Sequence, residues 1–426
     1  MRDFARSDNS AVQAQLDRLA QLSVPDGRLG LETIRALLER LGNPHGKLPP
    51  TFHVAGTNGK GSTCAFLRAM LEAEGYKVHV TTSPHLVRYN ERIRVAGELI
   101  SDERLAELLA EVLDAGEDLN PSFFEVTIAA AFTEFARVPA NACVVEVGLG
   151  GRFDATNVLE PEVLAACGIA ALGIDHERFL LAPEKGVPEE PLARIAFEKA
   201  GIAKRGVPLV TVKGNNPPHA QQVIEAIAEC KGAPLHEVHC FENGNIYIDD
   251  YHYHEPGIRG PHQERNAALA NGMLRLQEKI SVSGDAIKKG IGSAFWPARM
   301  QLLGPGPLTA LAGQQDIWLD GGHNPSAGAA IAKAINGPLH LVLGMLENKD
   351  PRSLLDPLEG RIRSLTVLPV PGHEAHPVEA FSSDARAAAN IEEALLAIPA
   401  DDYPILIAGS LYLAGEVLRL NDELPD

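Results

Sequence analysis

The sequence has few cysteines and no long apolar run. Its 426 residues include five cysteines, none of which form a C-x-x-C pair: Cys64, Cys143, Cys167, Cys230 and Cys240. This usage is typical of free thiols in a reducing compartment rather than of a disulfide framework. The longest apolar stretch, residues 163–174, is well short of the roughly 20 residues that a membrane-spanning helix needs, so no membrane partner is expected. The first residues contain no apolar signal core, and the expected location is the cytoplasm.

An excess of basic residues is also lacking. Lys and Arg number 38 and Asp and Glu number 56, which gives a formal net charge of −18. Nucleic acids and anionic membranes are bound through basic surfaces, so a general role in binding either is excluded. A local basic pocket can still oppose the overall field, and an anionic small-molecule substrate remains compatible with the composition. With 45% hydrophobic and 22% charged residues, the chain is expected to fold, and its length indicates two or three domains.

Short apolar, β-branched runs alternate with helical patterns, which predicts a largely parallel α/β sheet. In the first part of the chain we expect strands at 51–55, 77–82, 142–147, 163–169 and 207–212, with helices over 62–74 and 124–136. The pattern restarts with strands at 316–320, 339–343, 365–370 and 404–407 and helices over 326–335 and 411–420. A boundary near 295–297, after a Lys- and Gly-containing stretch at 288–292, divides the chain into domains of residues 1–295 and 296–426. The segment 243–254 alternates like an edge hairpin.

The strongest local signal is a glycine-rich segment between the first expected strand and its helix. It consists of Gly56, Thr57, Asn58, Gly59, Lys60, Gly61, Ser62 and Thr63. Glycines let successive N–H groups point at one anion, and a helix N-terminus adds partial positive charge. Lys60 is expected to contact the β- and γ-phosphates of a nucleotide, with a hydroxyl from Ser62 or Thr63 near a metal. The strict G-x-x-x-x-G-K-[ST] pattern is not met, because Val54 replaces the first glycine and Gly61 follows the lysine. An ordinary glycine turn that caps a helix is therefore the competing interpretation.

Polar side chains follow several of the expected strands. Glu146 ends an apolar strand before a glycine turn, and ligands collect at this edge of open α/β sheets, so we predict that it binds a metal such as Mg²⁺. Ser83 occupies an equivalent place, although taken alone it is more simply explained as a turn residue. Asp320 ends a strand of the second domain, where it can bond a ribose, interact with a metal or cap the next helix. Considered by themselves, His176 and Lys199 are typical of structural or exposed residues.

Taken together and in this order, these segments resemble the folylpolyglutamate synthase and dihydrofolate synthase family, a branch of the Mur ligase superfamily. The matching segments span nearly the whole chain: 29–33, 53–62, 82–86, 90–93, 123–127, 146–157, 197–202 and 320–325. The resemblance implies a P-loop-containing, mostly parallel N-terminal domain that binds ATP and a smaller Rossmann-like α/β domain for glutamate ligation. It also implies an ADP-forming ligase, commonly a monomer, that joins L-glutamate to dihydropteroate or to a reduced folate.

The resemblance carries over roles for individual residues. Beyond the phosphate loop, it implies nucleotide contacts at Asn266, Arg299 and Asp320. It implies magnesium ligands at Ser83 and Glu146 for one ion and at His176 for a second. Lys199 matches a lysine that the family carries as a carbamate, which turns a cation into an anion able to support metal and phosphate. The family's pterin-binding loop, a nearby flexible loop and a shared motif imply substrate contacts at Gly30, Leu31, Glu32, Thr33, Ser122, Phe123, Phe124, Glu125 and Asp154.

The sequence also departs from the family pattern. Residues 177–191 replace a usually shorter connection with a Thr-Glu-x-Leu-Gly-like run, which leaves the geometry around His176 open. Gly322 stands where alanine is common, and Ala298 precedes Arg299 where glycine is usual. Two other functions remain to be separated: a ligase of the same superfamily that acts on a cell-wall nucleotide precursor, and a P-loop NTPase switch without ligase chemistry. The short region before residue 51 and the second α/β domain argue against these two, respectively.

The implied reaction makes a carboxylate reactive. ATP would phosphorylate the substrate carboxylate to an acyl phosphate, the α-amine of glutamate would attack it, and phosphate would leave. Protein groups would mainly position the reactants and neutralise charge, a role that suits Lys60, the loop amides and two Mg²⁺ ions. Closure of the site would keep water from the acyl phosphate. The base that deprotonates glutamate is left open between His323, which lies in the motif of Asp320, and His176.

Overall fold

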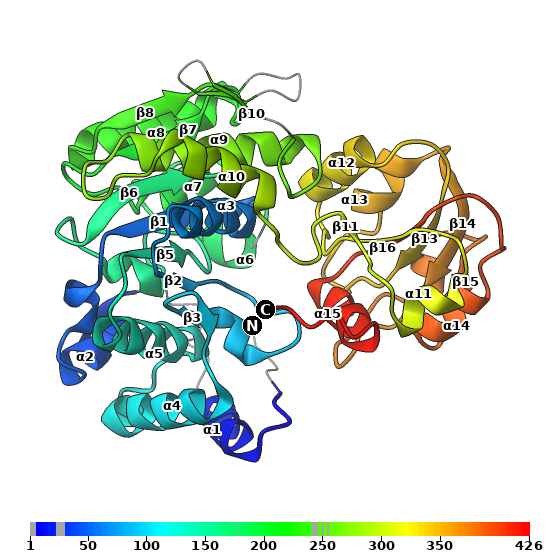
Figure 1. Ribbon diagram of the computed structural model, residues 1–426, viewed down its shortest axis with the longest axis horizontal. Coiled ribbons are helices and arrows are strands. Elements are labelled where there is room, and N and C mark those ends of the chain that lie inside the picture. Colours follow the sequence, from blue (N-terminus) through cyan, green and yellow to red (C-terminus); the bar gives the residue numbers. More distant parts are fainter. Residues whose placement is uncertain (1–5, 23–29, 176, 241–245, 249–250, 254) are drawn as a thin grey trace. The chain divides into compact units, whose positions relative to one another are not determined.

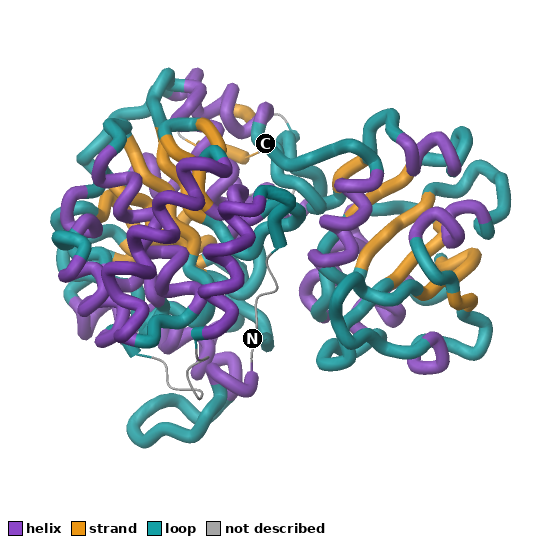
Figure 2. The backbone as a smooth tube through the Cα atoms, turned by 90° about the horizontal axis from the view of Figure 1, so that it is seen from below, coloured by secondary structure: helices purple, strands orange, loops and turns teal. Residues whose placement is uncertain are grey.

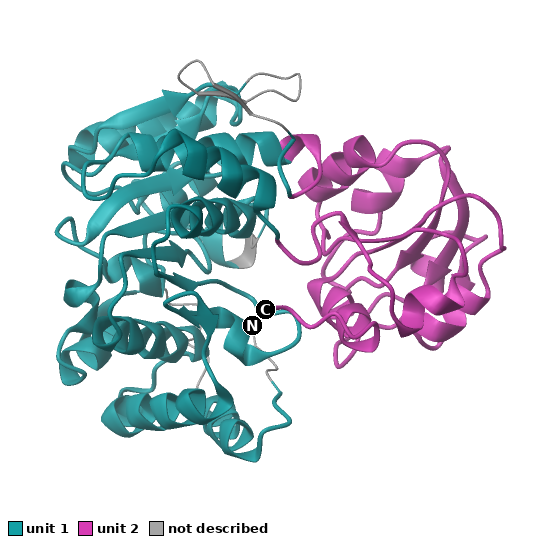
Figure 3. Ribbon diagram, in the orientation of Figure 1, with its two compact units in different colours: residues 1–257, 263–295 teal, residues 258–262, 296–426 magenta. Residues whose placement is uncertain are grey.

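The computed structural model describes residues 6–22, 30–175, 177–240, 246–248, 251–253 and 255–426 (Figure 1). Its contacts divide the chain into two compact units, residues 1–257 with 263–295 and residues 258–262 with 296–426 (Figure 3). Figure 2 shows the strands of the larger unit enclosed by helices. Both units are α/β structures with a mostly parallel sheet, as the sequence predicted.

The first unit is built on an eight-stranded sheet in the order β4-β3-β2-β5-β1-β6-β7-β8. Its strands are β1 (Thr51–Ala55), β2 (Val78–Thr81), β3 (Ile93–Val95), β4 (Glu98–Leu99), β5 (Ala142–Glu146), β6 (Leu164–Ile169), β7 (Leu209–Val212) and β8 (Leu235–Val238). The six strands from β2 to β8 in this order run parallel, and β3 and β4 are antiparallel additions at one edge. The central strands β1, β5 and β6 are buried along their whole length, which explains their continuous apolar runs.

Helices surround this sheet. Before residue 296 they are α1 (Ser10–Gln21), α2 (Glu32–Arg40), α3 (Lys60–Ala73), α4 (Asp102–Gly116), α5 (Phe123–Arg137), α6 (Glu177–Leu180), α7 (Pro191–Ala200), α8 (Pro218–Lys231), α9 (Pro261–Arg275) and α10 (Gly284–Ser293). Short 3₁₀ helices are η1 (Pro44–Lys47), η2 (Tyr89–Arg92), η3 (Glu117–Leu119) and η4 (Ala155–Val158). Within the described ranges, no helix combines the length and apolar character that crossing a bilayer requires.

Helix α10 contains the Lys- and Gly-containing stretch that precedes the predicted boundary. Residues 288–292 lie inside α10, and α10 packs against α3 (Figure 1). The two backbones approach closely at Gly290, where an added Cβ would lie 2.4 Å from Met70 Cα. The Ser283 hydroxyl caps α10 and also donates to Glu74 Oε2 at 2.6 Å. Gly290 therefore allows the close packing of α10 on α3.

The segment 243–254 is only partly as expected. Its described residues form β9 (Ile246–Ile248) and β10 (Tyr251–Tyr253), which pair antiparallel as a hairpin. They make a two-stranded sheet of their own and do not extend the edge of the large sheet, so that part of the prediction was wrong. Residues 243–245, 249–250 and 254 of this segment lie outside the described residues.

The second unit has a six-stranded sheet in the order β11-β12-β16-β13-β14-β15. Its strands are β11 (Gln301–Leu302), β12 (Ile317–Leu319), β13 (Leu339–Leu343), β14 (Ile362–Val367), β15 (Arg386–Ala387) and β16 (Ile405–Ala408). Its helices are α11 (Pro307–Leu311), α12 (Pro325–Ala334), α13 (Arg352–Leu355), η5 (Asp356–Leu358), η6 (Val378–Ala380), α14 (Ile391–Leu396) and α15 (Leu411–Leu420). Only the pairing of β11 with β12 is antiparallel. The buried core of this unit includes Leu341, Leu343, Met345 and Leu406.

Candidate active site

The glycine-rich loop joins β1 to α3. Gly59 takes a left-handed conformation with φ 85° and forms the N-cap of α3, which begins at Lys60. The first N–H groups of an α-helix have no acceptor inside the helix, so those of Lys60, Gly61 and Ser62 are placed to bind an anion. Gly59 offers no side chain as a cap, so these N–H groups can donate to an external partner. The phosphate site at the first turn of α3 stays a prediction, and these N–H groups are the ones available for it.

Two amides of the loop serve a different purpose. The backbone N–H groups of Thr57 and Asn58 both donate to the carbonyl of Ala171, at 2.9 and 3.1 Å. The Thr57 hydroxyl donates to the carbonyl of Gly173 at 3.0 Å. These bonds hold the start of the loop against the chain after β6. The N–H groups of Thr57 and Asn58 are therefore engaged within the protein, and only the second half of the loop remains for phosphate binding. Lys60 Nζ lies 3.4 Å from the Thr57 carbonyl, at the rim of the same loop.

Asn266 lies directly against this loop. A Cβ placed on Gly59 would be 2.3 Å from Asn266 Oδ1, so a larger residue there would displace the Asn266 side chain from the loop. The Asn266 amide donates to Gln263 Oε1 at 2.9 Å, which fixes its orientation. The Thr63 hydroxyl donates to the Gly59 carbonyl at 2.8 Å. The structure thus brings Asn266 to the predicted nucleotide site from a segment some 200 residues further along the chain.

Ser83 and Glu146 meet at the carboxyl edge of the sheet. Glu146 ends β5 and pairs in register with Val54, two residues before the phosphate loop. The backbone N–H of Ser83 donates to Glu146 Oε2 at 3.0 Å, which places the serine beside the carboxylate. Glu146 is only 5% exposed. The structure thus brings the two predicted metal ligands together at this edge of the sheet, and the metal site itself stays a prediction.

The donor set suits a magnesium ion. Among the described residues, no group of three or more His, Cys, Asp or Glu side chains could hold a metal ion by itself. Mg²⁺ does not need such a cage, because it keeps several waters and is bound through one or two protein oxygens together with phosphate oxygens. Ser83 and Glu146 can supply those protein oxygens. His176, the predicted ligand of a second ion, lies outside the described residues.

Lys199 is buried near the end of α7, so it is not a surface lysine. It is 4% exposed. Burial and the positive charge of Lys60 lower the pKa of Lys199 to about 7, although Asp154, Asp175 and Glu198 act in the opposite direction. A lysine with this pKa exists partly as a neutral amine near neutral pH, and a neutral amine is a nucleophile. The site therefore contains an amine that is able to react.

Asp154 holds the turn that follows β5. Its carboxylate accepts hydrogen bonds from the N–H groups of Leu149 at 2.8 Å and Thr156 at 3.0 Å. The Thr156 hydroxyl donates to Asp154 and lies 2.8 Å from Nε2 of the buried His53 on β1. Burial raises the pKa of Asp154, and these amides partly offset the effect. Asp154 was predicted to contact substrate, whereas its described bonds position the turn next to Glu146.

The predicted substrate segments lie on α2 and α5. Ser122 caps α5 and Glu125 completes the capping box, with the Glu125 carboxylate accepting from the Ser122 N–H at 2.8 Å. The Phe124 ring packs on Gly148, where an added Cβ would be 2.4 Å from Phe124 Cζ. The segment 122–125 is therefore held against the turn that follows Glu146. Gly30–Thr33 leads into α2, which packs against α5.

In the second unit, Asp320 holds a turn by its own carboxylate. Oδ2 accepts from the N–H of Met300 at 2.9 Å, and Oδ1 accepts from the N–H of Gly322 at 2.7 Å. The next helix, α12, is instead capped by Asn324, whose side chain accepts from Ala327. The interpretation of Asp320 as a helix cap was therefore wrong. Burial raises the pKa of Asp320, and the charge of Arg299 opposes this rise.

Arg299 and His323 gather around the same turn. Arg299 Nη1 donates to the Ala298 carbonyl at 2.9 Å and would lie 3.0 Å from a Cβ placed on Gly321. Ala298 and Met300, on either side of it, take positive φ values of 53° and 43°. Non-glycine residues in this conformation are strained, and such strain clusters at functional sites. His323 Nδ1 donates to the Gly321 carbonyl at 3.0 Å.

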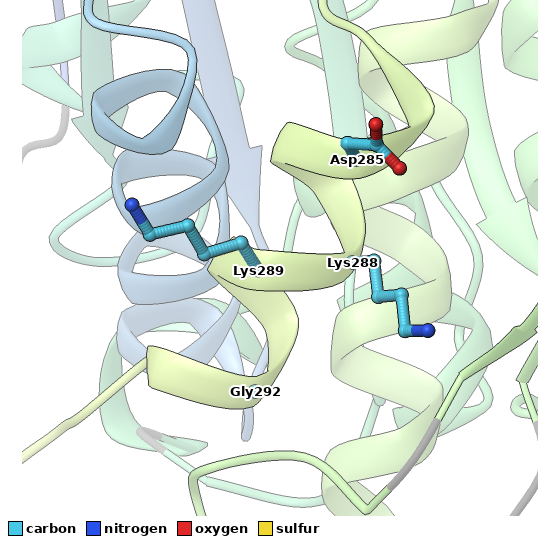
Figure 4. Close-up of a pocket in the computed structure, with 4 residues that line it drawn as sticks. All are labelled: Asp285, Lys288, Lys289 and Gly292. Carbon is cyan, nitrogen blue, oxygen red and sulfur yellow. The ribbon is translucent and has the colours of Figure 1, made fainter.

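A surface depression on α10 contains none of the predicted site residues. It is lined by Asp285, Lys288, Lys289 and Gly292. Figure 4 shows that Lys288 and Lys289 project to different sides of the helix. Their ammonium groups do not converge on one point, so this depression has no built anion site.

Sequence reasoning missed the contacts that hold these residues in place. His53 reaches the turn at Thr156 across 103 residues of sequence, and no local pattern signals such a pair. Arg152 lies in the matching segment 146–157, and no role was predicted for it. Its N–H donates to the Glu198 carbonyl at 2.7 Å. The only available signal for Arg152 was its place in the glycine turn directly after the predicted metal ligand.

Comparison with known proteins places the chain in a family. No family model matches it. It is 35% identical over 359 residues to the dihydrofolate synthase/folylpolyglutamate synthase of Bacillus subtilis, covering 78% of each chain. It is 32% identical over 440 residues to the protein of the same name from Escherichia coli, covering 97% of this chain and 96% of the relative.

Solved structures agree over the whole length. FolC of E. coli in complex with DHPP and ADP is 28% identical, with a TM-score of 0.82 over 98% of this chain and 99% of that one. A bifunctional folylpolyglutamate synthase/dihydrofolate synthase with Mn, AMPPNP and L-glutamate bound is also 28% identical, with a TM-score of 0.79 over 97% and 99% of the two chains. The strand-end site, the two α/β units and these likenesses lead to one conclusion: the chain belongs to the folylpolyglutamate synthase/dihydrofolate synthase family.

Proposed function

We propose that the protein joins L-glutamate to dihydropteroate and to reduced folates in an ATP-dependent reaction that releases ADP and phosphate. The observation that carries this proposal is the position of Ser83 against Glu146 at the sheet edge where Lys60 opens α3. Two relatives are named for both activities, and solved relatives were obtained with DHPP and ADP and with Mn, AMPPNP and L-glutamate. The names and ligands of these relatives support a bifunctional enzyme.

The chain's own groups fit the activation of a carboxylate. A carboxylate resists attack by an amine until one of its oxygens becomes a phosphate leaving group. The first-turn amides of α3 would bind the nucleotide phosphates, and Lys60 would neutralise charge on the transferred phosphoryl group. Ser83 and Glu146 would hold Mg²⁺, which supplies further charge neutralisation when it is bound. Phe124 and its neighbours in 122–125 would contact the pterin ring beside this site.

Lys199 fits the proposed carbamate. Its neutral amine attacks the carbon of CO₂, an N–C bond forms, and one proton is released to leave an anion. The positive charge of Lys60 favours that anion, because the carbamate would compensate it. The modified side chain could then support a second magnesium ion together with His176.

The resemblance to the family also implies nucleotide contacts among residues of the second unit. Asp320 would accept a hydrogen bond from the ribose, and Arg299 would add positive charge near the phosphates. His323 and His176 remain the two candidates for the base that deprotonates glutamate. All five cysteines lie in the described part of the chain and are free thiols, which supports a location in the reducing cytoplasm. We further propose that the protein acts as a monomer.

The test is a glutamate-incorporation assay that offers dihydropteroate and tetrahydrofolate separately, with ATP and Mg²⁺. We expect each acid to be glutamylated, with one ADP released per glutamate added. If glutamate is incorporated into neither acid, the proposal is overturned. If it is incorporated into only one of them, the protein has a single activity. The variant Lys60→Ala should lose synthesis in both assays. Full synthesis by that variant would show that the phosphate site has been assigned to the wrong loop.

A further inference from the structure

Four charged side chains form a closed ring beside Lys199. Arg152 binds Glu198 through Nε at 3.1 Å and Nη2 at 2.9 Å. The same guanidinium binds both carboxylate oxygens of Glu184, at 2.9 and 2.5 Å. Arg194 closes the ring, because its Nη2 lies 2.7 Å from Glu184 and 3.2 Å from Glu198. The two arginines and two glutamates balance in charge.

Three separate segments contribute to the ring. Arg194 and Glu198 belong to α7, the helix of Lys199, and both are almost completely buried. Arg152 comes from the glycine turn that follows Glu146. Glu184 comes from residues 177–191, where the sequence departs from the family pattern. The ring therefore connects the segment 177–191 both to α7, which carries Lys199, and to the turn that follows Glu146.

The contact between the turn and α7 is close enough to fix the helix. The Arg152 N–H donates to the Glu198 carbonyl at 2.7 Å. A Cβ placed on Gly151 would lie 3.0 Å from Lys199 Cα, so the turn rests directly on the lysine backbone. The Arg152 guanidinium also lies 4.9 Å from the ring centre of Phe197. Any shift of Arg152 would therefore be transmitted to the backbone of Lys199.

Glu184 joins the two arginines from the solvent side. Its side chain is 40% exposed, whereas those of Arg194 and Glu198 are 6% and 4% exposed. Hydrogen bonds from Arg152 and Arg194 lower the pKa of Glu184 to about 2, so it is ionised at neutral pH. Bidentate pairing of arginine with a carboxylate restricts geometry more than a single contact does.

We propose that Glu184 is a positioning residue, which holds Arg152 and Arg194 together so that the turn after Glu146 stays against α7 and the Lys199 amine stays where CO₂ can reach it. This inference rests on the proposed function only through the carbamate on Lys199. It assigns a role to the segment 177–191, which replaces the family's usual connection. Loss of the Glu184 charge would loosen Arg152 and leave the buried Glu198 with a less well oriented partner.

The experiment titrates carbamate formation directly. Protein without nucleotide is treated with ¹³C-bicarbonate, and the carbamate carbon is followed by NMR, with Lys199→Met to identify its signal. The variant Glu184→Gln removes the charge and keeps the size of the side chain. Glu184→Asp restores the charge, and Glu189→Gln makes the same change at an exposed position of the same segment. Thermal unfolding of each variant checks that it is folded.

We expect Glu184→Gln to need about fivefold more bicarbonate for half-occupancy, a size typical of a partly exposed ion-pair network. Glu184→Asp should recover most of this loss, and Glu189→Gln should behave as the parent does. Equal titrations for the parent and Glu184→Gln would overturn the inference, as would a parent without a carbamate signal or an equal effect in Glu189→Gln. If Glu184→Gln unfolds, Glu184→Ala replaces it, and a titration of folded Glu184→Ala equal to that of the parent would overturn the inference as well. The ligase reaction is measured independently in the glutamate-incorporation assay, so failure of one does not imply failure of the other.

Discussion

The carboxylate of Glu146 is expected to carry most of the metal affinity supplied by the protein. The change Glu146→Gln keeps an oxygen for the Ser83 N–H but removes the negative charge. We therefore expect the Mg²⁺ concentration for half-maximal ligase activity to rise by at least about tenfold. A Mg²⁺ titration of initial rates measures this. The variant Glu229→Gln, at an exposed position on α8, should keep the parent titration, and an unchanged curve for Glu146→Gln would contradict the metal site.

Lys199 should make activity depend on dissolved CO₂. Only the neutral amine reacts with CO₂, and the pKa of Lys199 is lowered to about 7 from 10.5. The neutral fraction of the unmodified amine thus rises steeply across neutral pH, and the carbamate should form more readily at about pH 8 than at about pH 6. We expect activity to fall in CO₂-free buffer and to return with bicarbonate. Lys199→Met should be inactive under both conditions, and parent activity that ignores bicarbonate would contradict the carbamate.

The same lysine makes a prediction about stability in CO₂-free buffer. Its pKa is about 7 in the folded protein and ordinarily 10.5 for an exposed lysine, so the unfolded chain binds more protons between these two pH values. Stability contributed at this position should therefore rise with pH across that window. Urea unfolding measures the free energy of unfolding of the parent and of Lys199→Met. The value for the parent minus that for Lys199→Met should increase as the pH rises from about 7 to about 10. A constant difference would mean that the amine is not desolvated.

At the scale of elements, the packing of α10 on α3 depends on one glycine. The change Gly290→Ala would place a Cβ 2.4 Å from Met70 Cα, and backbone cannot move aside as a side chain can. We expect a loss of about 1–3 kcal/mol in the free energy of unfolding, as for other overpacked sites. Gly292, two residues along the same helix, has nothing within 4 Å of an added Cβ. Gly292→Ala should be neutral or stabilising by about 0.5–1 kcal/mol, and equal urea curves for both variants would contradict the close approach.

Elements with strong local patterns were predictable, and contacts between distant segments were not. β1, β13 and α15 have the predicted bounds. The two strands are continuous apolar runs and the helix has one amphipathic pattern, and each pattern has clear ends. Ser83 and Glu146 could be predicted to meet, since neighbouring parallel strands end at one edge. The bond between His53 and Thr156 could not, because strand order is set by packing across the whole sheet. The contact of Gly290 with α3 could not be predicted either, because glycine marks both linkers and close helix contacts.

For the whole molecule, the central question is whether both units serve one reaction. The phosphate loop, Glu146 and Lys199 belong to the first unit, whereas Arg299 belongs to the second. A cation that acts on the transferred phosphoryl group contributes mainly in the transition state. We therefore expect Arg299→Ala to lower kcat by about a hundredfold or more, the size seen when one charge-stabilising donor is removed. Steady-state rates with saturating ATP, folate and glutamate measure the effect.

The matched control is Arg386→Ala, an exposed arginine of the same unit and the same sheet. It should leave kcat unchanged, which separates the role of Arg299 from the general loss of one positive charge in an acidic protein. ADP binding to the first unit, followed by calorimetry, should be weakened much less than kcat in Arg299→Ala, because the first-turn amides of α3 remain. If kcat were unaffected while thermal unfolding stayed at the parent value, the second unit would contribute no charge to phosphoryl transfer. The positive φ values of Ala298 and Met300 would then need another explanation.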